Sequence, residues 1–160
     1  MAQGAKAVAG TQVTLVPVQD ATPAGLVDYD AIILGSPVHN ANVAPEIQSF
    51  INSWPLHGTP LRDKIGAAFV SAGGISAGEE AVQLSILRSM LIFGMIVVGG
   101  PEWTSAFGAS AVTDEAPFAA VSENGHVAEQ FLEKGRKLGQ RVAELARRLK
   151  RRNNPYPHRR

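Results

Sequence analysis

The chain has 160 residues, of which 45% are hydrophobic, and a net charge of +1. These values predict one compact domain over residues 1–150, followed by a basic, disordered tail at 151–160. The sequence contains no cysteine, which excludes disulfide frameworks, iron–sulfur clusters and thiolate zinc sites, and its four histidines show no metal-ligand spacing. No apolar run approaches the ~20 residues of a membrane span, and no secretory signal is visible, so we expect a cytoplasmic protein.

Basic residues concentrate at the C-terminal end of the chain. Seven of the fifteen Lys and Arg residues lie in the last fourteen positions, where no acid occurs: Arg147, Arg148, Lys150, Arg151, Arg152, Arg159 and Arg160. Such a cluster could bind nucleic acid or anionic lipid. A solvated helix end is the simpler interpretation, because cations also suit the negative end of a helix dipole. We therefore expect no nucleic-acid partner.

The first half of the chain contains patterns of both strand and helix. We expect a helix at 1–9, a strand at 11–18, a loop at 19–28, a strand at 30–35 and a helix at 45–54. Gly10 is typical of a residue that closes a helix. The continuous apolar run at 30–35 is typical of a strand covered on both faces in a parallel sheet. Pro45 suits the first turn of a helix whose inner face carries Phe50 and Ile51.

The second half repeats this plan. We expect a strand at 64–71, a loop at 72–78, a helix at 79–94, a strand at 95–100, an irregular segment at 101–117 and a helix at 122–152. Ser122 is the expected N-cap of the last helix, whose apolar residues recur at helical spacing. Strands that alternate with helices predict an α/β fold built on a parallel sheet.

Two loops of this predicted sheet have the composition of a binding site. Ligands of open parallel sheets bind beyond the carboxyl ends of the strands, where both loops begin. The loop at 35–42 offers small residues with hydroxyl, amide and imidazole groups, and the glycines at 71–80 leave backbone N–H groups uncovered. A flat polar heterocycle fits between them. The candidate binding residues are Ser36, Pro37, Val38, His39, Asn40, Asn42, Ser71, Ala72, Gly73, Gly74, Ile75, Gly78 and Glu79.

Several motifs follow one another in a characteristic order. They are "YDAIILGSP" at 29–37, the Phe50–Ile51 pair, "KIGAAFVS" at 64–71 with the glycine-rich loop and Glu79, "GMIVV" at 94–98 and "FGAS" at 107–110. In these residues nearly the whole chain resembles the flavodoxin-like NAD(P)H:quinone oxidoreductases, the WrbA-like family, and more broadly the NADPH-dependent FMN reductases. The resemblance implies a three-layer, doubly wound parallel sheet.

The same resemblance implies FMN as the cofactor at the two loops, with two electrons passing from NAD(P)H to a quinone. No side chain is expected to be catalytic, because the flavin carries the chemistry. Trp103 and Phe107 are candidates for a substrate slot, although ordinary packing would also explain them. His39 is either a partly charged neighbour of the flavin or a surface residue. The resemblance further suggests a homo-oligomer, dimer or tetramer, with the helix at 79–94 as a candidate contact.

The chain departs from the family pattern at its start. A doubly wound sheet of this type has strand order 2-1-3-4-5, and a loop after its first strand holds the phosphate of FMN. Met1 aligns within the first helix, so we expect a sheet missing its first strand and its phosphate loop. A start assigned too far downstream is the simplest explanation, and a fragment or a genuine variant are the alternatives. The strands at 11–18 and 30–35 would then have unpaired edges. We expect the FMN affinity of such a chain to fall by orders of magnitude.

Two other functions fit parts of the sequence. "GISAG" at 74–78 satisfies the G-x-S-x-G pattern of a nucleophile elbow, with Ser76 as the nucleophile and Asp114 and His126 in the order found in hydrolases. Alternatively, the domain is a non-catalytic module for interaction or oligomerisation that binds no cofactor. Flavin colour and labelling of Ser76 by a fluorophosphonate would distinguish these possibilities.

Overall fold

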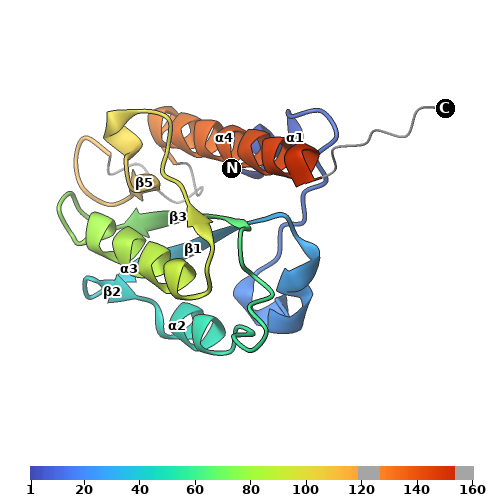
Figure 1. Ribbon diagram of the computed structural model, residues 1–160. Helices are drawn as coiled ribbons and strands as arrows, with labels where there is room; N and C mark the ends of the chain where they lie inside the picture. Colours follow the sequence, from blue (N-terminus) through green and yellow to red (C-terminus); the bar gives the residue numbers. More distant parts are fainter. Residues whose placement is uncertain (119–126, 154–160) are drawn as a thin grey trace.

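The computed structural model describes residues 1–118 and 127–153, which form three layers (Figure 1). The elements are α1 (Ala2–Lys6), β1 (Ala31–His39), β2 (Asn42–Val43), α2 (Pro45–Asn52), β3 (Ile65–Ala72), α3 (Glu79–Ile92), β4 (Ile96–Val97), β5 (Ala109–Val112) and α4 (Glu129–Asn153). Helices α2 and α3 cover one face of the sheet, whereas α4, with α1 packed against it, covers the other. The predicted three-layer α/β fold is confirmed.

Strand β3 lies at the centre of the sheet and pairs in parallel with three other strands. β1 follows one edge of β3 from Ala31 to Pro37. The other edge is shared by β4, opposite the first two residues of β3, and β5, opposite its last four. β2 is antiparallel and folds back on the end of β1. Among the described residues, the sheet therefore has the order β2-β1-β3-β4, with β5 also on β3.

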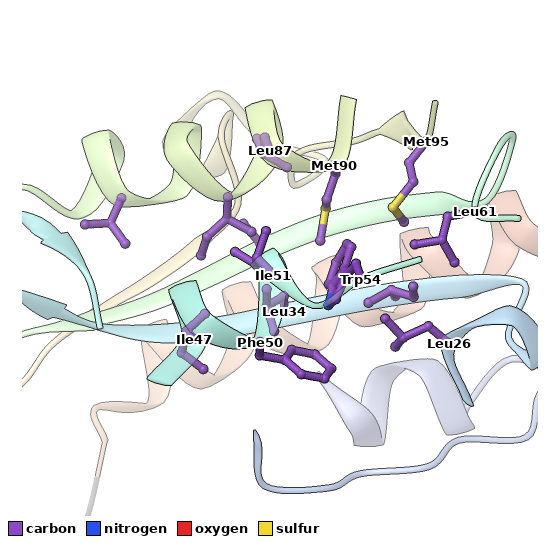
Figure 2. Packing of buried hydrophobic residues seen from close by; sticks show 14 of the residues in the cluster. Leu26, Leu34, Ile47, Phe50, Ile51, Trp54, Leu61, Leu87, Met90 and Met95 are labelled. Carbon is purple, nitrogen blue, oxygen red and sulfur yellow. The ribbon is translucent and has the colours of Figure 1, made fainter. Parts of the chain in front are cut away.

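The side chains of β3 alternate between the two hydrophobic cores. Ile65 and Ala67 face α4, whereas Ala68 and Val70 face α2 and α3. Both sets are buried, which explains the continuous apolar run that predicted this strand. Figure 2 shows the larger core, in which Trp54 lies among side chains from α2, α3 and β1.

Helix α1 is anchored to α4 by glycines at their crossing. A Cβ at Gly4 would lie 1.9 Å from the carbonyl oxygen of Arg136, and one at Gly139 would lie 2.1 Å from the carbonyl oxygen of Met1. The helix ends at Lys6, earlier than predicted, although Gly10 has the expected left-handed conformation with φ of 79°. These two contacts bring the backbones closer than any side chain would allow.

The predicted strand at 11–18 is wrong. Residues 11–17 pair with no described strand, and Val18–Asp20 forms a 3₁₀ turn. Leu15 is 80% exposed. Its β-branched neighbours favour extended backbone, but a strand also needs an adjacent strand to accept and donate its hydrogen bonds. Among the described residues, the edge of β1 opposite β3 pairs only with β2.

The strands observed after α3 differ from those predicted. The strand expected at 95–100 is reduced to β4, and the segment expected to be irregular contains β5 and a 3₁₀ turn at Trp103–Ser105. Between β4 and β5 the chain leaves the sheet and returns to the same edge of β3. The base of this excursion is closed by a hydrogen bond of 2.8 Å from the Gly100 N–H to the Ser105 carbonyl.

Two other predicted boundaries change. Residues 35–39, expected in a loop, continue β1, so the connection to β2 is a two-residue turn. The last helix starts at Glu129 instead of 122 and ends at Asn153, one residue after its expected end at 152. The proposed N-cap Ser122 and residues 154–160 of the predicted tail lie outside the described residues.

Candidate functional site

Two connections meet at the edge of the sheet where β1 and β3 end. The β1–β2 turn places Asn40 and Ala41 at φ of 51° and 59°, the conformation of a tight hairpin. The β3–α3 loop, residues 73–78, ends at Gly78 with φ of 106°. A Cβ at Gly78 would lie 2.8 Å from the Cα of Ala41. The two connections are therefore in contact, and only glycine fits at the point where they cross.

Ser36 and Pro37 of the first predicted binding segment belong to β1. Ser36 is only 3% exposed. Its hydroxyl donates a hydrogen bond of 2.7 Å to the carbonyl of Pro37 and accepts one of 3.0 Å from the N–H of Ala44. These bonds tie the end of β1 to the start of α2, so the hydroxyl is used within the fold.

The remaining residues of this segment lie at the turn or next to it. Val38 is half-buried and packs against the core between the sheet and α2 and α3. His39, Asn40 and Asn42 are exposed, and the side-chain amide of Asn42 donates a hydrogen bond of 2.7 Å to the carbonyl of Asn40. The turn therefore presents imidazole and amide groups to solvent at the carboxyl edge of the sheet.

The β3–α3 loop is held by two carboxylates. The N–H of Ser76 donates to Oε1 of Glu79 at 3.1 Å, and the N–H of Ile75 donates to Oε2 of Glu115 at 2.5 Å. The other oxygen of Glu79, Oε2, is buried and has no partner among the described residues. The side chain of Ile75 is 52% exposed. The loop therefore combines an apolar surface with backbone amides that already bind acceptors.

The start of this loop lies beside the segment that follows β5. Ala72, the last residue of β3, accepts hydrogen bonds from both the N–H and the hydroxyl of Thr113, while the adjacent Ser71 is exposed. Sequence reasoning missed Glu115, because forty residues separate it from Ile75 and no motif links them. The missing signal is the pairing of β5 with β3, which brings these segments together.

Neither connection carries a cation. No Lys or Arg occurs between Lys6 and Arg62, or between Lys64 and Arg88. Carboxylates are present instead, because Asp114 Oδ2 would lie 3.3 Å from a Cβ at position 73 and the loop amides bind two further acids. Like charges repel, so this edge disfavours a dianionic phosphate and better suits a neutral group with hydrogen-bonding atoms.

Trp103 and Phe107 do not lie at the two connections. Trp103 is 88% exposed and belongs to the 3₁₀ turn of the excursion between β4 and β5. Phe107 lies two residues before β5, whose first residue, Ala109, pairs with Phe69. Phe69 is three residues from the end of β3, about 10 Å along a strand, so Phe107 lies at the far end of β5 from the β3–α3 loop.

The structure places Ser76 four residues beyond the end of β3, within a loop. Its φ of 59° is unusual for a residue other than glycine, as the pattern of a nucleophile elbow would require. A nucleophile elbow, however, is a sharp turn directly from strand to helix, and no described histidine is hydrogen-bonded to Ser76. His126, the proposed base, lies outside the described residues.

Other surfaces of the described chain offer two grooves. One, of about 400 Å³, lies between α4 and Pro101, and one of about 520 Å³ lies between α2 and α3. Within residues 1–118 and 127–153 no cluster of three or more metal-ligating side chains occurs. The helices of the same ranges include none that is long and apolar enough to cross a bilayer.

The sequence profile of the NADPH-dependent FMN reductases matches residues 11–110, well over half of the chain. This protein belongs to the NADPH-dependent FMN reductase family. The matched region contains both connections of the candidate site and strands β1 to β4. The family expected from the sequence motifs is therefore confirmed.

Curated relatives agree with this family assignment. A protein named NAD(P)H dehydrogenase (quinone) from Archaeoglobus fulgidus is 34% identical over 133 residues, which cover 81% of this chain and 65% of that protein. One of the same name from Gluconacetobacter diazotrophicus is 32% identical over 140 residues, covering 81% of this chain and 69% of the relative. This FMN reductase family member thus spans about two thirds of their length.

Solved structures confirm the flavodoxin-like fold. A flavodoxin, WrbA-like protein from Agrobacterium tumefaciens superposes with a TM-score of 0.65 at 20% identity, over 78% of this chain and 71% of the other. A flavodoxin from the domain Archaea gives a TM-score of 0.66 at 19% identity, over 90% and 83% of the two chains. At these identities the likeness concerns the fold alone.

Proposed function

We propose that this protein is an FMN-dependent oxidoreductase that passes two electrons from NAD(P)H to quinones. The observation that carries the proposal is the contact between the β1–β2 turn and the β3–α3 loop at the carboxyl edge of a parallel sheet, where ligands of such sheets bind. Membership of the NADPH-dependent FMN reductase family supports the cofactor, and the names of the two relatives support the electron donor and acceptor. The proposal includes a cytoplasmic location.

The residues at the two connections fit the ring of FMN better than its phosphate. Ile75 offers a half-exposed apolar side chain for a ring face, and Asn40 and Asn42 offer amide groups for its polar edge. Gly73 and Gly74 add no side chain to the loop, although the carboxylates of Asp114 and Glu115 lie beside them. A phosphate would meet carboxylates here and no Lys or Arg of either connection. We therefore assign the ring, and not the phosphate, to this edge.

Bound FMN supplies the two-electron chemistry that links a nicotinamide to a quinone. The protein's part is to position the ring and exclude water from it. Ile75 would cover one face, and the amides of Gly73 and Gly74 would donate to the polar edge, where negative charge grows on reduction. His39, at the exposed end of β1, would lie beside this edge. Trp103 and Phe107 would contact only a substrate that extends back along β5.

Flavin binding and turnover test this proposal directly. The purified chain should take up FMN with a change in flavin fluorescence, and the loaded protein should oxidise NADH or NADPH when a soluble benzoquinone is supplied. Ile75→Asp should weaken flavin binding at least tenfold, because it places a charge against an apolar ring face. The control is Leu15→Asp, which changes an aliphatic residue that is 80% exposed and lies outside the site.

The same experiments address the alternative of a non-catalytic module. A chain that is colourless after incubation with millimolar FMN and removal of the free flavin, and that leaves the fluorescence of added FMN unchanged, would contradict the oxidoreductase and support the module. If Ile75→Asp and Leu15→Asp change flavin affinity equally, the flavin does not bind at the β3–α3 loop. Absence of NAD(P)H oxidation by a flavin-loaded protein would limit the proposal to cofactor binding.

We propose that the protein forms a homo-oligomer, dimer or tetramer, through α3. This helix exposes a stripe formed by Glu80, Leu84, Arg88 and, one turn on, Ile92, which is 74% exposed. Two copies packed antiparallel about Leu84 would place each Glu80 opposite the Arg88 of the other copy. The groove of about 520 Å³ between α2 and α3 lies next to the stripe and includes Arg88 and Ile92 in its wall.

Light scattering after size-exclusion chromatography tests this contact. Leu84→Glu should reduce the oligomer to a monomer, because it places two like charges at the centre of the interface. Leu132→Glu, on α4, changes a leucine of similar exposure and should leave the mass unchanged. A wild-type protein that is monomeric at high concentration would contradict the oligomer, and a Leu84→Glu oligomer would contradict the role of α3.

A further inference from the structure

The chain beyond β5 continues to follow the β3–α3 loop after both strands have ended. The N–H of Thr113 donates to the carbonyl of Ala72 at 2.9 Å, and the N–H of Asp114 donates to the carbonyl of Gly73 at 3.1 Å. Backbone pairing therefore extends past the ends of the strands and places the side chain of Glu115 over the loop.

Glu115 then reaches across Gly74 to the next amide. Its Oε2 accepts the N–H of Ile75 at 2.5 Å, and a Cβ at Gly74 would lie 2.9 Å from the same oxygen. Bonds of this kind, between an amide and a carboxylate, are stronger than those between neutral groups. The glycine at 74 thus has a specific role, because it leaves room for the carboxylate of Glu115.

An amide N–H has one hydrogen, so it cannot fully serve two acceptors at once. We propose that Glu115 competes with the ligand of the candidate site for the N–H of Ile75 and thereby sets the affinity of the β3–α3 loop. The inference rests on the proposed function, which places a heterocycle at this loop. The competing ligand group is a carbonyl oxygen or an unprotonated ring nitrogen at the edge of that heterocycle.

Glu79 holds the amide next to that of Ile75, independently of Glu115. Its Oε1 binds the N–H of Ser76, the amide next to that of Ile75. Glu79 is the first residue of α3, so this bond fixes the loop to the start of the helix. Release of Glu115 would therefore free the amide of Ile75 while Ser76 keeps its partner. Glu115 thus acts on ligand affinity through the backbone amide of Ile75 and not through a contact with the ligand.

Amide hydrogen exchange followed by NMR tests the bond itself without any ligand. Glu115→Ala and Gly74→Ala should each speed exchange at Ile75 about fivefold, the factor that corresponds to ~1 kcal/mol for one hydrogen bond. The Gly74→Ala side chain would displace only the flexible end of Glu115, so the fold should be kept. Asp114→Ala and Gly73→Ala are matched controls, because neither changes an acceptor of this amide. Equal exchange in all five proteins would overturn the inference.

Riboflavin titration tests the competition. This ligand is neutral, so removal of a carboxylate charge has little direct effect on it. Glu115→Ala should bind riboflavin about fivefold more tightly than the wild-type protein, the effect of one released amide. Glu115→Gln, which keeps a weaker acceptor, should fall between them, and Asp114→Ala should match the wild type.

Weaker or unchanged riboflavin binding by Glu115→Ala would overturn the competition. A further outcome separates it from the proposed function. If Ile75 exchange responds as expected but no variant binds riboflavin or FMN, the proposed function fails and the competition fails with it, whereas the bond between Glu115 and the loop stands. If flavin binds but Ile75 exchange is the same in all variants, the proposed function stands and Glu115 has no role in it.

Discussion

Gly35→Ala should destabilise the protein because the ring of Phe69 occupies the space of the new side chain. Gly35 lies opposite Phe69 on the neighbouring strand. A Cβ at position 35 would lie 1.9 Å from Cζ, 2.2 Å from Cε1 and 2.5 Å from Cε2 of the ring. The ring would have to retreat by about 1.5 Å to reach the 3.4 Å of ordinary contact. Overpacking of this kind costs about 1–3 kcal/mol.

The second half of the experiment isolates that contact. Phe69→Leu removes the three ring atoms that obstruct position 35. The backbone at Gly35 does not have positive φ, so alanine is sterically acceptable there once the ring is gone. In the Phe69→Leu protein, Gly35→Ala should therefore raise the free energy of unfolding by about 0.5 kcal/mol, as replacement of a strand glycine usually does.

Urea unfolding of the four proteins measures the coupling between the two sites. We expect a coupling of about 2.5 kcal/mol between positions 35 and 69, within the range for residues in direct contact. If Gly35→Ala costs the same free energy in both backgrounds, the reasoning is wrong, and the glycine would then be required for another reason. The result also bears on function, because the sequence alone suggested that small residues near position 35 serve the approach of a ligand.

Three further predictions concern α4 and the candidate site. Gly139→Ala should lower the melting temperature, because its Cβ would lie 2.1 Å from the carbonyl oxygen of Met1. Gly135→Ala should raise the melting temperature, because its Cβ would lie 3.6 Å from Cγ of Met1, which is ordinary contact. A rise in both variants would contradict the close helix crossing. The hydrogen bond with Glu102 raises the pKa of Lys137. The stability that this pair contributes should persist below the ordinary lysine pKa of 10.5 and be lost as the pH rises through the higher pKa of the folded state. If the difference in unfolding free energy between wild type and Lys137→Met already vanishes near neutral pH, this prediction is wrong. Riboflavin should bind less than about tenfold more weakly than FMN, because neither connection supplies a charged donor; a larger ratio in calorimetry would indicate a phosphate site.

The sequence predicts the elements whose own residues determine them. The strand at 64–71 is recognisable because Ile65, Ala67, Ala68 and Val70 fill cores on both faces, which requires an unbroken apolar run. Pro45 marks the start of α2 through its own backbone preference, and α3 starts at Glu79, directly after the predicted loop at 72–78. These signals are local, and each survives the change from sequence to structure.

Elements that depend on a distant neighbour are predicted poorly. Leu15 and the β-branched residues around it read as a strand, yet no described strand lies beside them, and backbone preference alone does not make a ladder. β5 shows the converse. Its four residues have little strand character, but pairing with the end of β3 holds them extended. The sequence of side chains does not show which sheet edge is available for a further strand to pair with.

The same limit applies to the candidate site. The two connections were expected to come together because the carboxyl ends of parallel strands meet at one edge, and Gly78 touches Ala41 as that argument requires. The involvement of Glu115 was not predictable, since it follows from the pairing of β5. Ser36 was assigned to a ligand on its chemistry, but its burial and its two internal bonds become visible only when α2 is in place.

The excursion between β4 and β5 is a segment whose tip could be exchanged for another sequence without changing the sheet. Its neck is sealed by the bond between Gly100 and Ser105, and a Cβ at Gly99 would lie 1.8 Å from the carbonyl oxygen of Ala106, so its two arms rest directly on each other. Both flanking strands are separately hydrogen-bonded to β3. Because each doubling of loop length costs only about 0.6 kcal/mol, foreign peptides could be grafted at the tip around Trp103. The same architecture would allow evolution to diversify that tip while the sheet and the two ligand connections stay unchanged.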